Sequence, residues 1–188
     1  MSRDPAAPTT RISVEDLQWL VGVAGRMGVA RTLHELALRC EEVLARFAVV
    51  EYDGLYLWDF RTSPPVLRLL YAHGFSEEER LVAEQTALER HPGWVVRTGE
   101  ALWVPDTRLT SPDSPSKNSP RRTEMRSRLW LPVAKDGEVF GAFGIASAVP
   151  DAFDERDREI LTFVAELAGI AYPRLRAEHS RHEQPIFS

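Results

Sequence analysis

The sequence has little cysteine, no long apolar run and no excess of positive charge. Its single cysteine, Cys40, excludes a disulfide within the chain and a zinc site built on cysteines. No apolar run approaches the roughly 18 residues that a membrane span requires. Residues 1–10 are polar and proline-rich, without the apolar segment of a signal peptide. We therefore expect a cytoplasmic protein that neither spans nor binds a membrane.

The charge balance argues against a nucleic-acid partner. The 188 residues carry 28 acidic and 23 basic side chains, a net charge of -5, whereas a nucleic-acid surface needs clustered excess base. One local basic cluster, at positions 121, 122, 126 and 128, is typical of a solvated loop.

The chain also lacks the usual signatures of catalysis. It has no P-loop and no glycine-rich nucleotide-binding turn. The carboxylates of Glu77, Glu78 and Glu79 stand on consecutive positions of an expected helix, so they point in different directions and form no acid–base pair. Cys40 lies in the apolar stripe of another expected helix, which predicts a buried structural thiol. We expect neither a catalytic residue nor a metal site, and no enzymatic activity.

Capping patterns mark the first helices. After a disordered lead over residues 1–12, Ser13 with Asp16 predicts the start of an N-terminal helix that occupies residues 13–31 with its following turn. Thr32 with Glu35 starts a longer helix, which ends near Phe47.

Alternating segments then predict two hairpins. Residues 54–60 and 66–72 form the first, while residues 128–134 and 139–147 form the second around the turn Asp136-Gly137. Between the hairpins we expect a helix from Ser76 to about residue 88, a short helix over 93–97, a strand over 101–104 and an irregular loop over 105–125. That loop is rich in proline and serine, and it is either a lid or a disordered segment.

Asp154 caps a final helix, which Pro173 should kink or stop. Residues 173–188 then form a polar tail. The order of elements predicts an α+β fold: a central antiparallel sheet of about five to six strands with helices on both faces. One domain should occupy residues 32–172.

Six short segments, taken in order, resemble the GAF family. None is specific by itself, but their order is. They are residues 69–75 (LLYAHGF), 93–100 (GWVVRTGE), 104–106 (VPD), 127–133 (SRLWLPV), 136–141 (DGEVFG) and 153–157 (FDERD).

The resemblance implies a regulatory domain with a ligand pocket between its sheet and the short helices and loops of one face. Ligands in this family include cyclic nucleotides, tetrapyrroles, haem, amino acids and nitrate, and other members serve as dimerisation modules. One branch, free methionine-R-sulfoxide reductase, uses pocket cysteines, and bilin attachment also needs a suitably placed one; Cys40 fits neither. Haem would need an axial ligand, for which His34, His73 and His91 are the candidates. The signature of cyclic-nucleotide-binding members is absent. The ligand and any cofactor stay unidentified.

Aromatic side chains suggest where the pocket lies. Tyr56, Trp58 and Phe60 share one side of their strand, opposite the leucines, and Arg128, Trp130 and Pro132 do so in a later strand. The leucine side suits packing on the long helices, so the aromatic side should face the pocket. An arginine there could pair with an anionic group. The expected ligand-binding residues are Tyr56, Trp58, Trp94, Arg97, Trp103, Asp106, Arg128 and Trp130. Alternatively, these rings simply fill the core.

The terminal helices carry more apolar surface than one sheet contact needs. The first has the stripe Leu17, Leu20, Val21 and Ala24, and the last has two, one through Ile160, Val164, Leu167 and Ala171 and another through Leu161, Ala165 and Ala168. We expect these faces to form a homodimer, although the first helix could instead cover the last within one chain. The predicted function is a small-molecule sensor that acts through a signalling partner; the alternative is a ligand-free dimerisation or interaction module.

Overall fold

The computed structural model describes residues 12–48, 50–109 and 125–182. Within these ranges, five strands form one antiparallel sheet in the order β2-β1-β5-β4-β3. The strands are β1 (Tyr52–Asp59), β2 (Val66–His73), β3 (Leu102–Val104), β4 (Ser127–Lys135) and β5 (Glu138–Ser147). Both predicted hairpins lie in this single layer, joined through the antiparallel pair β1–β5.

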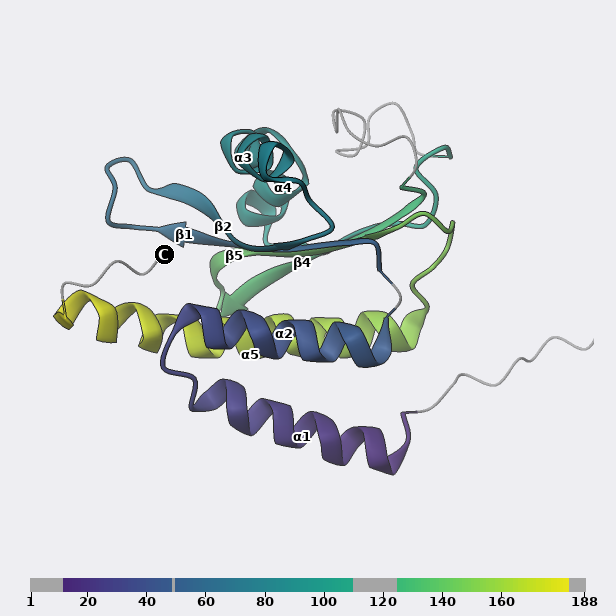
Figure 1. Cartoon of the computed structure of the whole chain (residues 1–188), viewed down its shortest axis with the longest axis horizontal. Helices are drawn as coiled ribbons and strands as arrows, with labels where there is room; N and C mark the ends of the chain where they lie inside the picture. Colours follow the sequence, from purple (N-terminus) through teal and green to yellow (C-terminus); the bar gives the residue numbers. More distant parts are fainter. Residues whose placement is uncertain (1–11, 49, 110–124, 183–188) are drawn as a thin grey trace, which may run out of the picture.

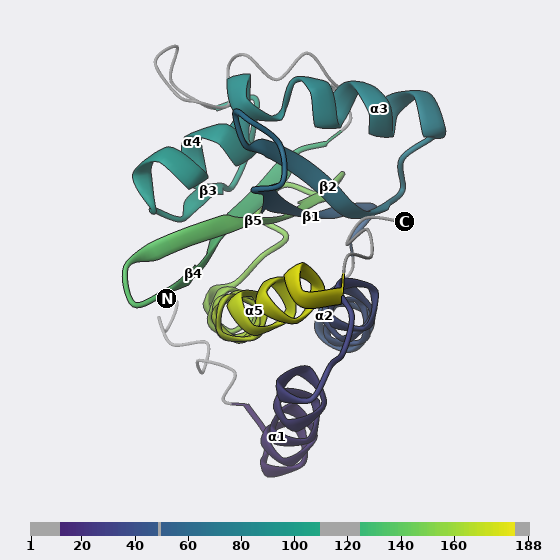
Figure 2. The ribbon, with the colours of Figure 1, turned by 90° about the vertical axis from the view of Figure 1, so that its left-hand side faces the viewer.

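Helices cover both faces of the sheet (Figures 1 and 2). One face carries α2 (Leu33–Phe47) and α5 (Glu155–His182), with α1 (Val14–Gly28) packed beyond them as a third layer. The other face carries α3 (Glu77–Gln85), a 3₁₀ turn (Ala87–Glu89) and α4 (His91–Thr98). The predicted α+β fold is therefore confirmed.

Local chemistry explains where the elements begin and turn. The Ser76 hydroxyl accepts from the amide of Glu79 while the Glu79 carboxylate accepts from the amide of Ser76, a complete capping box. At the β4–β5 turn Asp136 and Gly137 both have positive φ, 51° and 83°, which is the conformation of a two-residue hairpin turn.

The main core lies between the sheet and α2 and α5. Leu55, Leu57, Leu129, Leu131 and Val133 all point into it, as the alternation predicted. Cys40 on α2 is buried there too, and burial raises the pKa of its thiol to about 12. A smaller cluster on the opposite face contains Tyr56, Leu67 and Leu69, with Trp58 and Trp130 packed against it.

Helix α1 buries only part of the stripe predicted for it. It packs on α2 and α5 through Leu20, Val23 and Met27, whereas Leu17 and Val21 are 48% and 70% exposed. Two ion pairs of Asp16 fix this rotation, because its carboxylate lies 2.9 Å from Arg46 on α2 and 3.0 Å from Arg156 on α5. The first helix thus covers the last within one chain, which was the alternative to a dimer interface.

Pro173 is expected from the sequence to kink or stop the last helix; it does not stop it, because α5 runs through Pro173 to His182. Residues 173–182, expected in a polar tail, are therefore helical. An internal proline costs about 3 kcal/mol, but its neighbours Tyr172 and Leu175 are fully buried. In addition, Nη2 of Arg174 donates to the carbonyl oxygens of Gly28 and Ala30 at 3.1 and 2.7 Å. Tertiary packing on both sides holds the helix together.

Some expectations fall outside the described residues. The disordered lead is described only at Ile12, and most of the predicted 105–125 loop, residues 110–124, is not described. At the base of this loop the amide of Thr107 donates to the carbonyl oxygen of Arg126 at 2.6 Å. In the described part of the chain no helix is long and apolar enough to cross a bilayer.

Candidate functional site

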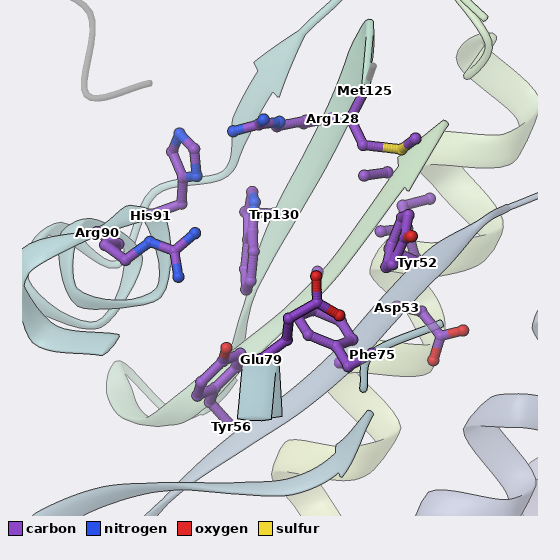
Figure 3. A pocket seen from close by; sticks show the side chains of 14 residues that line it. Tyr52, Asp53, Tyr56, Phe75, Glu79, Arg90, His91, Met125, Arg128 and Trp130 are labelled. Carbon is purple, nitrogen blue, oxygen red and sulfur yellow. The ribbon is translucent and has the colours of Figure 1, made fainter. Parts of the chain in front are cut away.

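A pocket lies between the sheet and the helices α3 and α4 (Figure 3). Its cavity of about 80 Å³ has room for roughly five to eight water-sized groups. Strands β1, β4 and β5 form the floor, and the beginning of α4 and the segment around α3 form the walls. The lining residues are Tyr52, Asp53, Gly54, Tyr56, Phe75, Glu79, Arg90, His91, Met125, Arg128, Trp130, Gly144, Ile145 and Ala146.

Two aromatic rings dominate the floor. Tyr56 on β1 and Trp130 on β4 have centroids 5.8 Å apart and planes tilted by 48°. They sit on either side of β5, where Gly144 pairs with both Gly54 and Trp130. A Cβ at Gly144 would lie 2.4 Å from the Trp130 ring. The missing side chain of Gly144 thus makes room for the indole, which lies flat across β5.

Three basic groups line the pocket. His91 opens α4 and is only 2% exposed, and Arg128 on β4 is 9% exposed. Burial, reinforced by the charges of Arg128 and Arg90, lowers the pKa of His91 to about 3, so the imidazole is neutral at pH 7. Burial and the charge of Arg90 lower the pKa of Arg128 to about 10, which leaves it protonated.

Two acidic residues also line the pocket, and both have partners. The Glu79 carboxylate caps α3 through the amide of Ser76 at 2.8 Å. Asp53 lies on the same side of β1 as Leu55, which is the side that faces α2 and α5. Its carboxylate points away from Trp130 in Figure 3. Its Oδ2 lies 3.3 Å from Nδ1 of His73, and burial raises the pKa of Asp53 to about 6. In the described ranges no group of three potential metal ligands comes together.

The structure brings three of the eight predicted site residues together. Tyr56, Arg128 and Trp130 line the pocket. The other five, which are Trp58, Trp94, Arg97, Trp103 and Asp106, do not.

Trp103 lies on the wrong face of the sheet for a pocket residue. It pairs with Leu129, which points into the main core, and it is 39% exposed with the guanidinium of Arg158 only 4.0 Å above its ring. In a strand of three residues the alternation is too short to show which side faces the helices. Asp106 instead forms an ion pair with Arg126 at the base of the 105–125 loop. This pairing lowers the pKa of Asp106 to about 2.

The remaining three residues are peripheral. Trp58 packs at the edge of the smaller cluster, 6.4 Å from the ring of Phe60. Trp94 is half-buried within α4, and the carbonyl oxygen of its peptide accepts from the Thr98 hydroxyl. Arg97 is exposed and donates to the carbonyl oxygen of Leu88 at 2.6 Å.

Sequence reasoning missed much of the pocket wall. The alternation of side chains along a strand cannot identify Phe75, Arg90 or Met125 as pocket residues, because these residues lie outside strands. The sequence indicates His91 only as a candidate haem ligand. A usable signal was present, since the Arg90-His91-Pro92-Gly93 segment opens a short helix directly over the sheet.

Several solved structures have the same fold and are 15–19% identical to this chain. The GAF domain of phosphoenolpyruvate-protein phosphotransferase from Acinetobacter has 18% identity and a TM-score of 0.66, with 92% of this chain and 100% of that chain covered. The domain named as that of a "putative two-component sensor histidine kinase protein" from Sinorhizobium meliloti has 17% identity and a TM-score of 0.63, with 82% of this chain and 100% of that chain covered.

A third neighbour overturns the expectation of a domain without enzymatic activity. Free methionine-R-sulfoxide reductase from Neisseria meningitidis, solved with its substrate, has 19% identity and a TM-score of 0.64, with 91% of this chain and 98% of that chain covered. Because the shared fold supports catalysis in that protein, the fold gives no ground for excluding an enzyme. Cys40, on which the exclusion of reductase chemistry depended, lies on α2, apart from the pocket lining.

The remaining comparisons concern sequence alone. No curated protein matches the chain. A family model described as GAF domain, however, matches residues 29–172, more than half of the sequence. This match agrees with the sheet order, the helices on both faces and the neighbouring structures. The chain therefore belongs to the GAF domain family.

Proposed function

We propose that this GAF domain is a regulatory module that binds a small molecule in the pocket between the sheet and α3 and α4. One observation carries the proposal. The Nε2 atom of His91 is buried at the pocket wall and has no hydrogen-bond partner within the described residues. A buried polar atom without a partner costs about 1–3 kcal/mol, so native proteins rarely keep one that nothing satisfies. A bound molecule would supply the missing partner.

The composition of the pocket supports the same function. Small-molecule sites combine mostly apolar and aromatic walls with a few fixed polar groups. Here Tyr56, Trp130 and Phe75 supply ring surface, while His91 and Arg128 supply nitrogen atoms. The sensor kinase domain among the structural neighbours makes a signalling role reasonable for this fold.

Native mass spectrometry tests this function with a matched pair of variants. We would incubate the purified protein with a small-molecule extract of cells and measure the mass of what stays bound. The wild type and Trp103→Ala should keep a ligand, because Trp103 lies outside the pocket. Trp130→Ala removes a pocket wall and should lose it. A wild type with no bound molecule, or binding that survives Trp130→Ala, would refute the proposal.

A second function, dimerisation, is favoured by a different observation. Helices α1 and α5 contact each other, and both leave large apolar side chains in solvent. On α1 these are Val14, Leu17 and Val21, at helical spacing along one side; on α5 they are Phe163 and Ile170. We call these five side chains the terminal-helix surface. It replaces the stripe predicted from the sequence, and it is compatible with ligand binding on the opposite face of the sheet.

A further inference from the structure

The basic groups of the pocket gather at one corner. In Figure 3 the polar ends of Arg90, His91 and Arg128 lie on the same side of the cavity as the indole nitrogen of Trp130. The rings of His91 and Trp130 are stacked, with centroids 6.0 Å apart and planes 28° apart. Arg90 and Arg128 are close enough to act on each other and on His91 through their charges. We call these four side chains the basic corner.

The side chains of the basic corner mainly donate hydrogen bonds. A guanidinium only donates hydrogen bonds, and so does an indole nitrogen. The neutral imidazole donates from one nitrogen, and Nε2 of His91 is buried without a partner in the described part of the chain. Arg128 is buried and is acted on by the positive charge of Arg90, and a bound anion would offset that repulsion. The corner therefore favours a ligand that accepts hydrogen bonds and carries negative charge.

The acidic residues of the pocket do not cancel this preference. Glu79 caps α3 and lies on the other side of Trp130, beside Phe75, in Figure 3. Asp53 is directed to His73 on the opposite side of the sheet. The pocket thus has a positive corner, and on the other side of the indole in Figure 3 lie the apolar side chains of Phe75 and Met125.

We propose that the ligand class of this pocket is a small organic carboxylate. Its carboxylate lies in the basic corner, where Arg128 can hold both oxygens in the planar, two-pronged geometry that guanidinium offers. Its apolar remainder packs on Trp130 and Tyr56. The cavity of about 80 Å³ limits that remainder to a few carbon atoms. This inference rests on the proposed function, since it requires that the pocket binds a small molecule at all.

Calorimetric titration with isobutyrate and isobutyramide tests the inference, because the two molecules have the same shape and differ in charge. Sodium chloride at equal ionic strength corrects for general salt effects. We expect saturable binding of isobutyrate and at least about tenfold weaker binding of isobutyramide, a difference of about 1.4 kcal/mol. Arg128→Gln should abolish the preference for the acid. Arg26→Gln is the control, because it removes the same single positive charge from an exposed position on α1. It should preserve the preference for the acid.

The outcomes separate this inference from the proposed function. If the amide binds as tightly as the acid, and Arg128→Gln leaves both unchanged, the carboxylate is refuted while a ligand pocket stands. If inorganic phosphate binds more tightly than isobutyrate, the ligand class is a phosphate and the inference is wrong. If neither the acid nor the amide binds and native mass spectrometry finds no ligand, both proposals fail. Should Arg128→Gln not fold, Arg128→Lys keeps the charge but loses the planar fork, and it should weaken acid binding selectively.

Discussion

Nδ1 of His73 lies 3.3 Å from Oδ2 of Asp53, across the antiparallel pair β1–β2. Burial nevertheless disfavours the ionised form of Asp53 and raises its pKa from 3.8 to about 6. The folded state therefore holds this proton more tightly than the unfolded state does. The contribution of the group to stability is complete below about pH 4 and is lost as the pH rises through 6.

Asp53→Asn should remove this pH dependence. Relative to the wild type, the variant should gain about 1–3 kcal/mol of unfolding free energy between pH 4 and pH 7. Urea denaturation at several pH values measures the difference. Parallel stability profiles for the two proteins across this range would show that Asp53 does not titrate as its burial implies.

Cys40 should resist thiol reagents while the protein is folded. It is fully buried on α2, and burial raises its pKa to about 12, so almost no thiolate exists at pH 8. Labelling with a chromogenic disulfide should proceed only as fast as the domain opens, and in urea it should become as fast as a free thiol. Rapid labelling of the native protein would contradict the burial of Cys40.

Gly144→Ala should damage the pocket and the sheet together. The new methyl group would meet the Trp130 ring at 2.4 Å and must displace it. We expect a loss of about 1–3 kcal/mol of stability, together with loss of ligand binding. Gly25→Ala on α1 is the control, because among the described residues nothing apart from the adjacent backbone of its own helix lies within 4 Å of the new Cβ; it should stabilise the protein by about 0.5–1 kcal/mol. Equal effects of the two substitutions in urea denaturation would disprove this account of Gly144.

The terminal-helix surface should form a homodimer. Sedimentation of the wild type is expected to give twice the chain mass, and Leu17→Glu with Val21→Glu should give a folded monomer. Both side chains are exposed, so their replacement spares the core. Leu20→Glu is a poor probe, because Leu20 is buried within the chain itself and its replacement should unfold the domain. A monomeric wild type would rule this interface out.

Sequence reasoning succeeded where a local rule fixes the outcome. Alternation in 54–60 and 128–134 placed Leu57 and Leu129 in the core and Tyr56 and Trp130 on the other face, because a strand's side chains must alternate. The capping patterns located the starts of α2 and α3 for the same local reason, and at α3 the capping box is complete.

It failed where tertiary contacts choose between local options. Helix α1 has two apolar stripes, and the ion pairs of Asp16 with α2 and α5 select the one through Val23 and Met27. No local rule reports such a distant partner. Pro173 is a comparable case, since the packing of Tyr172 and Leu175 outweighs its preference. Arg90 and His91 belong to the pocket only because α4 folds back over the sheet.

The continuity of α5 through Pro173 has a mechanical consequence. A helix of 28 residues is a rod about 42 Å long. The hydroxyl of Tyr172 donates a hydrogen bond to the carbonyl oxygen of Trp58, which is two residues along β1 from the pocket residue Tyr56. Arg174 donates to the carbonyl oxygens of Gly28 and Ala30, where α1 connects to α2. Tyr172 and Arg174 are only about 3 Å apart along the helix axis, so the strand and the connection are anchored to the same short stretch of the rod. A helix interrupted at Pro173 would separate these two anchors, so a displacement of the strand would no longer reach the α1–α2 connection through one rigid element.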